Sequence, residues 1–342
     1  MIMDIFENRG STLPVWFMRQ AGRYHSHYQN IKKDSDFMTM CKNPELACEI
    51  TLGPIEDFKF NAAILFSDLL FPLEQLGMGL SYKSGPPTLE WHLKSVEDIQ
   101  KLKVMAPGKE FYAFQGEACK LLRERLPKDV TLLGFVGAPF TLYTYAVEGS
   151  HAGNLVSAKK GLFDGRFEAF CNLLVPEVLE EMVVQAENGA QAIALFDTAA
   201  GELCVQDYKE FIVPKITDLL SKFKARCPQT KIIYYSKHTQ SQFIKALDLT
   251  HIDVIGVDWR CDLVEIQSIL PKHVYVQGNL DPAWLHLPWE ILEKKASAYY
   301  QDLRERGLDF SRWIAGLGHG VLIQTPEENV RNLVKLIQSQ KI

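Results

Sequence analysis

The stretch "NAAILFSDLLFP" (61–72) joins a short apolar run to an acidic residue, Asp68. Residues 61–66 are almost entirely apolar, as expected of a parallel strand that is covered on both faces. A carboxylate just after such a strand can accept N–H bonds or stabilise developing positive charge, although it also commonly caps the next turn. The stretch therefore predicts a buried strand that delivers an acidic group to one edge of a sheet.

Six further runs of the same kind follow along the chain. They are residues 131–136, 191–196, 231–236, 252–257, 273–277 and 313–317. Most are separated by helical patterns, such as 167–189 and 325–340, and Thr325 with Glu328 predicts a capping box at the start of the latter. This alternation of strands and helices predicts a parallel sheet.

The residues that follow each run favour a closed sheet over an open one. The runs lead into "SDLLFP", "GAPFT", "DTAAG", "KHTQS", "DWR", "GNLDP" and "GHG". In a (β/α)8 TIM barrel all strands end at one mouth, where the active site lies, whereas an open doubly wound sheet carries a Gly-rich turn after its first strand. The chain has no G-x-G-x-x-G. We expect one α/β domain, a (β/α)8 barrel over residues 1–342, with its eighth strand near 13–17 or 79–83.

Composition and charge indicate the kind of partner. The 342 residues are 47% hydrophobic and carry a net charge of −5, so no global basic field attracts nucleic acid or an anionic membrane. The seven cysteines include no C-x-x-C, which favours reduced thiols. Asp4 and Glu7 lie where a signal peptide would carry positive charge, and no apolar segment approaches the roughly 18 residues of a membrane span. These features predict a soluble cytoplasmic protein that binds neither nucleic acid nor membrane.

Two arginines, Arg19 and Arg23, lie in the aromatic stretch "PVWFMRQAGRY" (14–24). A guanidinium offers a planar fork to carboxylate or phosphate, so a pair of them suits a multiply charged anion. Two structural salt bridges are the alternative. The aromatic surroundings predict half-buried arginines, and because an unpaired desolvated arginine is costly, they favour a functional role.

Several other side chains follow the predicted strands. His319 lies between two glycines that let the backbone approach a ligand closely. Tyr145 could donate its hydroxyl or simply pack. Asp197, Thr198, Asp258 and Asp281 also follow strands, and each could equally cap a turn. The chain has no H-E-x-x-H, G-x-S-x-G or H-x-C, so it offers no familiar zinc protease, serine hydrolase or thiolate–histidine metal site.

Two long motifs, "PVWFMRQAGRY" and "GFVGAPFTLYTYAVEG" (134–149), resemble the two signatures of the uroporphyrinogen decarboxylase family. Further matches follow in the family's order: "AAILFSD" (62–68), "VIGVDWR" (254–260), "VQGNLDP" (276–282) and "GLGHG" (316–320). The resemblance runs from about residue 12 to the C-terminal helix. It implies a single-domain (β/α)8 barrel that usually forms a homodimer. It also implies removal of carbon dioxide from the four acetate side chains of uroporphyrinogen III, giving coproporphyrinogen III, in heme biosynthesis without a metal or organic cofactor.

The same resemblance implies roles for individual residues. An N-terminal segment would bind the substrate's carboxylates through Arg19, Gln20, Ala21, Gly22 and Arg23. Asp68 would stabilise a protonated, cationic pyrrole, which accepts electrons as carbon dioxide leaves. Arg19 would also manage the charge of the reacting acetate, so Asp68 and Arg19 are the predicted catalytic residues. Tyr145, Thr198 and His319 would contact the substrate.

The chain also departs from the family pattern. The family's "AGRYLPEYR" becomes "AGRYHSHYQNIKK" here, and an arginine of the family is replaced by Lys32. Thr198 stands where serine is usual, and the family's "NLGHG" followed by a proline becomes "GLGHGVLI" (316–323). Two rival functions share the barrel: a corrinoid-linked methyltransferase, which would hold zinc through ligands that include H-x-C, and a tetrapyrrole carrier that releases no carbon dioxide.

Overall fold

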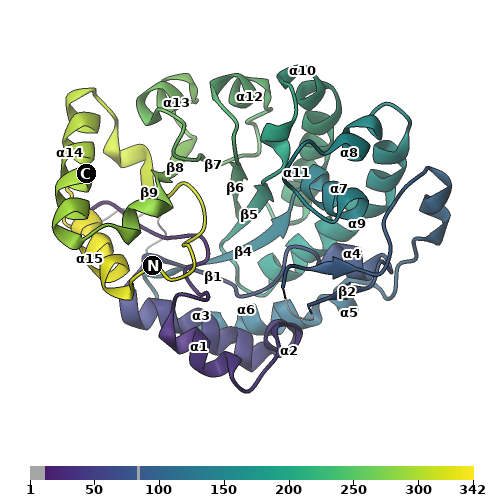
Figure 1. Cartoon of the computed structure of the whole chain (residues 1–342), viewed down its shortest axis with the longest axis horizontal. Coiled ribbons are helices and arrows are strands. Elements are labelled where there is room, and N and C mark those ends of the chain that lie inside the picture. Colours follow the sequence, from purple (N-terminus) through teal and green to yellow (C-terminus); the bar gives the residue numbers. More distant parts are fainter. Residues whose placement is uncertain (1–11, 83–84) are drawn as a thin grey trace.

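Seven parallel strands form one curved sheet in the computed structural model, which describes residues 12–82 and 85–342 (Figure 1). The strand order is β1-β4-β5-β6-β7-β8-β9, so each strand pairs with its neighbours along the chain. The bounds are β1 Ala62–Ile64, β4 Thr131–Gly137, β5 Ala192–Asp197, β6 Lys231–Ser236, β7 Val254–Gly256, β8 Tyr275–Leu280 and β9 Trp313–Leu317. All seven predicted runs are confirmed as strands, and β8 continues three residues beyond its predicted end.

The N-terminal segment closes this sheet into a barrel. Val15 pairs in parallel with Ala315 of β9, and the backbone N–H of Asn61 donates to Val15 O at 2.9 Å. The Asn61 side chain completes the contact, because its Oδ1 accepts from Val15 N at 3.0 Å. Val15 therefore fills the gap between β9 and β1 as the eighth strand position, one of the two predicted places. The other, around residue 80, instead forms β2 (Leu80–Ser81), which pairs antiparallel with β3 (Thr88–Leu89) in a separate hairpin.

An apolar cluster lies inside the barrel, separate from the larger core between the sheet and the helices, and its packing favours a closed sheet. Alternate residues of the strands point inward, where Phe135 packs on Phe196 at 5.7 Å between ring centroids and Phe196 on Tyr235 at 5.9 Å. Trp16 and Met18 of the N-terminal segment belong to the same cluster. Such a packed interior is typical of (β/α)8 barrels, so the closed form predicted from the strand ends is confirmed.

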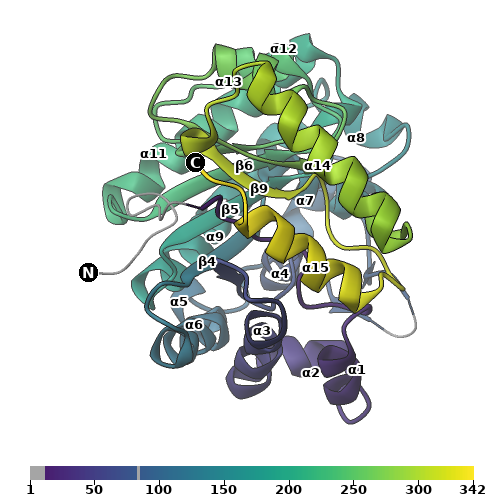
Figure 2. The ribbon, with the colours of Figure 1, turned by 90° about the vertical axis from the view of Figure 1, so that its left-hand side faces the viewer.

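Helices cover the outer face of the sheet. Their bounds are α1 Ser26–Lys32, α2 Phe37–Lys42, α3 Pro44–Phe58, α4 Phe71–Gln75, α5 Gly108–Phe111, α6 Ala113–Arg125, α7 Pro139–Glu148, α8 Val156–Lys160, α9 Arg166–Glu187, α10 Val205–Asp207, α11 Val213–Arg226, α12 Ser241–Ala246, α13 Leu263–Ile269, α14 Trp289–Glu305 and α15 Glu327–Gln338. The two predicted helices correspond to α9 and α15. Figure 2 shows α14 and α15 lying along the outside of β9, and α15 also packs against α3. The first and last parts of the chain thus meet.

The predicted capping box of α15 is wrong. The helix begins at Glu327 after Pro326, whose side chain accepts no hydrogen bond. Thr325 instead donates its hydroxyl to Leu322 O at 2.8 Å, a nearer acceptor in the preceding turn, and lies 3.1 Å from His286 Nε2.

Two further features concern the environment of the protein. In the part of the chain that the structure describes, no helix is both long and apolar enough to cross a membrane. All seven cysteines are free thiols, and all but Cys204 are buried.

Candidate active site at the mouth of the barrel

Asp68 lies four residues beyond the end of β1, on the segment that leads to α4. Its side chain is buried, with the residue only 8% exposed. Oδ1 accepts from the Leu70 backbone N–H at 2.7 Å, and the Tyr82 hydroxyl donates to Oδ2. Burial raises the pKa of this carboxyl, and the two hydrogen bonds oppose the rise. Asp68 is thus held by a local turn and a tyrosine rather than by capping α4, whose N-cap is Leu70.

Arg19 and Arg23 are exposed, so the prediction that they are half-buried is wrong. Their apolar neighbours turn inward, Trp16 into the barrel and Phe17 into the outer core, and this leaves the arginines at the surface. Arg19 adopts a left-handed backbone conformation (φ 57°). Neither guanidinium has an ion-pair or hydrogen-bond partner within residues 12–82 and 85–342, so the structural salt bridges are not formed there.

The residues between the two arginines hold the segment in place. The Gln20 amide is buried, and in the orientation that satisfies both of its atoms it donates to Ala62 O and accepts from Ile64 N, each at 3.2 Å. These contacts complete the edge of β1. Ala21 and Gly22 are half-buried, and Gly22 O accepts from the His25 backbone N–H at 2.9 Å.

Tyr145 lies on α7, and the charges of both Asp68 and Arg19 affect the pKa of its hydroxyl. Burial and, to a lesser extent, the charge of Asp68 together raise the pKa of its hydroxyl to about 12, and Arg19 opposes the rise. Its hydroxyl lies 2.6 Å from His151 Nδ1. The predicted residues Asp68, Arg19 and Tyr145 are therefore brought together at the mouth.

His319 lies on the loop after β9. Its ring stacks on that of Tyr235 with an interplanar angle of 4°, and its Nδ1 lies 3.4 Å from the Tyr235 hydroxyl. Burial lowers the pKa of His319 to about 3, helped by the positive charges of Arg19 and Lys237. The imidazole is therefore neutral at physiological pH. It lies close enough to Arg19 for the charge of that arginine to lower its pKa.

Four mouth residues were not singled out from the sequence. Lys237 and His238 directly follow β6, and their positive charges lower the pKa of His319. His151 contacts Tyr145, and Tyr82 contacts Asp68. The signal for the first two was present, because "KHTQS" follows a predicted strand like every other mouth segment. His151 lies on a loop that no periodicity marks, and Tyr82 lies within residues 79–83, where the sequence predicted only a possible strand.

The remaining acidic candidates have structural contacts. Asp197 is fully buried at the end of β5 and accepts hydroxyl hydrogens from Thr141 and Tyr234, each at 2.9 Å; burial raises its pKa to about 6. Asp258 accepts from the backbone of His238 and Arg260, and Asp281 caps a short turn through Ala283 N. Thr198 is half-buried directly after β5.

The departures near residue 25 are packing features. His25 is buried with its Nε2 2.7 Å from Asp57 Oδ2, and His27 Nε2 lies 3.1 Å from Glu49 O, so both rings contact α3. Gly53 makes room for His27, because a Cβ there would lie 2.4 Å from the ring. Lys32 is exposed at the end of α1.

Over the described ranges, no three His, Cys, Asp or Glu side chains gather as a metal ion would require. A cavity of about 190 Å³ lies beside the ends of β7 and β8, lined by residues that include Trp259, Trp284, Tyr299 and Arg306. Asp281 lines it, but none of the residues to which the family resemblance assigns a role does.

Comparisons with known proteins connect this geometry to a family. The sequence pattern of the uroporphyrinogen decarboxylase family matches residues 7–340. A uroporphyrinogen decarboxylase of Geobacter sulfurreducens is 34% identical over 96% of this chain and 95% of its own length, and one of Roseiflexus sp. is 36% identical over 95% and 93%. A methyltransferase from Methanosarcina mazei has a similar fold, with a TM-score of 0.73 over 97% of this chain and 95% of its own, at 18% identity. That last likeness concerns the fold alone.

Proposed function

Because the chain belongs to the uroporphyrinogen decarboxylase family, we propose that it is a carboxy-lyase of tetrapyrrole biosynthesis that converts uroporphyrinogen III to coproporphyrinogen III. Each step replaces the carboxylate of one acetate side chain by a proton and releases carbon dioxide. The four steps leave methyl groups at the four positions. The substrate begins with eight carboxylates and ends with four.

Asp68 is the proposed centre of this chemistry. Protonation of a pyrrole carbon beside the acetate makes the ring cationic, and the ring then accepts the electron pair of the breaking carbon–carbon bond. A buried carboxylate that faces the pyrrole N–H groups would stabilise that cation, since such interactions are strong where water is excluded. The Tyr82 hydroxyl and the Leu70 N–H fix the orientation of the Asp68 carboxyl.

Arg19 and Arg23 are proposed to hold substrate carboxylates in an N-terminal binding segment that extends through Gln20, Ala21 and Gly22. Both guanidinium groups are exposed and lack partners in the described part of the chain, so their hydrogen-bond donors are available to an anion. Arg19 is also proposed to manage the charge of the reacting acetate, since it lies near Tyr145 and His319. Tyr145, Thr198 and His319 would complete the contacts with the substrate.

One observation supports this proposal above the others: the charges of the buried Asp68 carboxyl and of Arg19, which has no ion-pair partner among the described residues, both affect the pKa of the Tyr145 hydroxyl. The decisive experiment incubates the protein anaerobically with uroporphyrinogen III, without added metal or cofactor, and separates the oxidised products by carboxylate number. Stepwise appearance of seven-, six-, five- and four-carboxylate porphyrins is expected. Binding without any loss of carboxylate would instead indicate a carrier.

The protein is further proposed to act as a homodimer in the cytoplasm. Seven free thiols agree with a reducing compartment, and a homodimer is what the family resemblance implies. Light scattering coupled to size-exclusion chromatography would give the mass in solution, for comparison with 38.9 kDa per chain.

A further inference from the structure

His151 lies on residues 149–155, which connect α7 to α8. Its Nδ1 lies 2.6 Å from the Tyr145 hydroxyl, and the two rings are 5.3 Å apart between centroids. Both residues are half-buried. His151 therefore contacts the hydroxyl that the proposed function assigns to the substrate, although it lies outside the motifs that carry the family resemblance.

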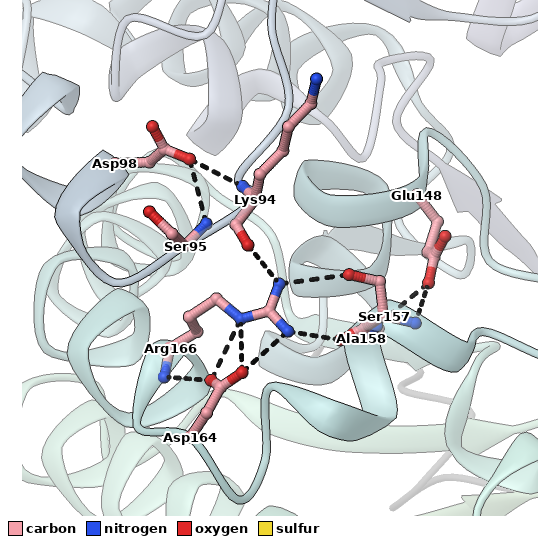
Figure 3. A network of polar contacts seen from close by, with 8 residues as sticks. All are labelled: Lys94, Ser95, Asp98, Glu148, Ser157, Ala158, Asp164 and Arg166. Carbon is pink, nitrogen blue, oxygen red and sulfur yellow. Dashed lines mark hydrogen bonds and ion pairs between the residues drawn. The ribbon is translucent and has the colours of Figure 1, made fainter.

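The connection that carries His151 is anchored at both ends. Glu148, the last residue of α7, accepts from the backbone N–H groups of Ser157 and Ala158 at 2.7 and 3.0 Å (Figure 3). Arg166 is buried and donates to Ser157 O, Ser157 Oγ and Lys94 O, while Asp164 holds its other side (Figure 3). His151 therefore contacts Tyr145 from a loop whose two ends are held in place by hydrogen bonds.

The surroundings of the His151 ring are cationic. Burial lowers its pKa, and the positive charges of Lys237 and Arg19 lower it further, against a smaller opposite effect of Glu202. A neutral imidazole carries one N–H, so the contact with Tyr145 has two possible directions. Either the tyrosine donates to Nδ1, or Nδ1–H donates to the tyrosine oxygen.

A bound carboxylate distinguishes these two arrangements, because an ionised carboxylate only accepts hydrogen bonds. If Tyr145 donated to His151, its oxygen would present lone pairs to the anion. If Nδ1–H donates instead, the hydroxyl hydrogen is free for the substrate, and the lone pair on Nε2 suits the neighbouring cations. The second arrangement therefore gives the substrate carboxylate a donor and keeps the contact between His151 and Tyr145.

We propose that His151 is a positioning residue that donates from Nδ1 to Tyr145 and thereby aims the tyrosine hydroxyl at a substrate carboxylate. The proposal rests on the proposed function, in which Tyr145 contacts uroporphyrinogen. It adds to the substrate-binding set a residue that acts through another residue.

Three variants test this role with uroporphyrinogen III as the probe. His151→Phe keeps a flat ring but removes the donor, so KM should rise about tenfold with a smaller change in kcat, as for one lost hydrogen bond. His151→Asn places an amide N–H near the position of Nδ1 and should restore most of the affinity. In a Tyr145→Phe background, His151→Phe should change KM less than twofold.

The outcomes separate this proposal from the one on which it rests. A wild-type protein that releases no carbon dioxide overturns the proposed function, and a Tyr145→Phe variant with normal KM overturns the role of Tyr145 and of His151 with it. With both intact, an asparagine variant as impaired as the phenylalanine variant would show that the ring acts by packing. So would equal effects of His151→Phe in the two backgrounds. Thermal unfolding of each variant confirms that the fold is retained.

Discussion

The side chain of Arg19 lies directly against Gly320, so that a Cβ at position 320 would come within 2.5 Å of Arg19 Cδ and 2.7 Å of Cγ. The neighbouring His319 is held on Tyr235. The glycine after His319 therefore makes room for the Arg19 side chain in its observed position.

Replacing Gly320 by alanine should displace Arg19 without unfolding the barrel. The atoms that clash belong to a flexible side chain, so the arginine moves and the backbone stays. We expect kcat/KM for uroporphyrinogen III to fall about tenfold to a hundredfold, as for a misplaced charged contact. Gly85→Ala is the matched control, because nothing lies within 4 Å of a Cβ there. Equal activity of the two variants would show that Arg19 does not need this position.

Asp68→Asn tests the stabilisation of the cationic pyrrole. The amide keeps the size of the side chain and an acceptor for Leu70 N, but it loses the negative charge, so kcat should fall about 10³-fold or more. Steady-state rates with product separation by carboxylate number measure the effect. The control is Asp281→Asn, another aspartate after a strand, where asparagine caps the turn equally well. Near-normal turnover of the Asp68 variant would remove this residue from the chemistry.

Arg23→Lys tests the recognition of carboxylates by the N-terminal segment. Lysine keeps the charge but loses the bidentate fork, so KM should rise about tenfold with little change in kcat. Initial rates over a range of substrate concentrations separate the two constants. Arg125→Lys provides a comparison on α6, where the arginine is exposed and pairs with Glu45 at 2.6 Å. An unchanged KM in the first variant would reassign Arg23 to structure.

The pH dependence of stability should reveal His319. Its pKa of about 3 in the folded protein lies below the ordinary value, so the unfolded chain binds the extra proton first as pH falls. Its contribution to stability is therefore complete above about pH 6.5 and is lost progressively toward pH 3. Between pH 7 and pH 5 the wild type should lose about 1–2 kcal/mol more unfolding free energy than His319→Asn.

Urea unfolding at the two pH values measures this difference. His273→Asn replaces an exposed histidine and should follow the wild type. If the His319 variant also followed the wild type, the imidazole would not be desolvated at the mouth.

Much of the barrel could be predicted from the sequence because its strands are buried on both faces. A strand covered by helices outside and by packed side chains inside is mostly apolar. The run "QAIALF" (191–196) is an example, because every residue after Gln191 is apolar. The eighth position could not be placed so firmly. Val15 occupies it through one bridge to Ala315 and two hydrogen bonds with Asn61, in which Val15 N–H donates to Asn61 Oδ1 and Asn61 N–H donates to Val15 O. This pairing is too short to leave a periodic pattern.

A side chain that follows a strand can be expected at the mouth from the sequence, although Lys237 and His238 were overlooked there, whereas contacts between loops leave no such pattern. Asp68 could be placed at the mouth, but its contact with Tyr82 depends on the β2–β3 hairpin. The prediction that Arg19 is half-buried is wrong because aromatic neighbours in the sequence need not surround the arginine in space. They instead point into the interior and leave the arginine outside.

Arg166→Lys tests the anchor of the loop that carries His151. The guanidinium satisfies Lys94 O, Ser157 O and Ser157 Oγ at once (Figure 3), and an ammonium group cannot reach all of these acceptors. We expect a loss of about 2–3 kcal/mol in unfolding free energy, because buried acceptors lose their donors. Faster proteolytic cleavage within residues 149–155 should accompany it.

The matched control for this last variant is Arg226→Lys on α11, whose exposed pair with Glu180 should contribute less than about 1 kcal/mol. Urea unfolding and limited proteolysis of both variants separate a buried anchor from a surface ion pair. If the Arg166 variant lost no more stability than the control and its loop resisted cleavage, the loop would be held by Glu148 alone. The His151–Tyr145 contact would then depend on the two backbone hydrogen bonds that Glu148 accepts from Ser157 and Ala158.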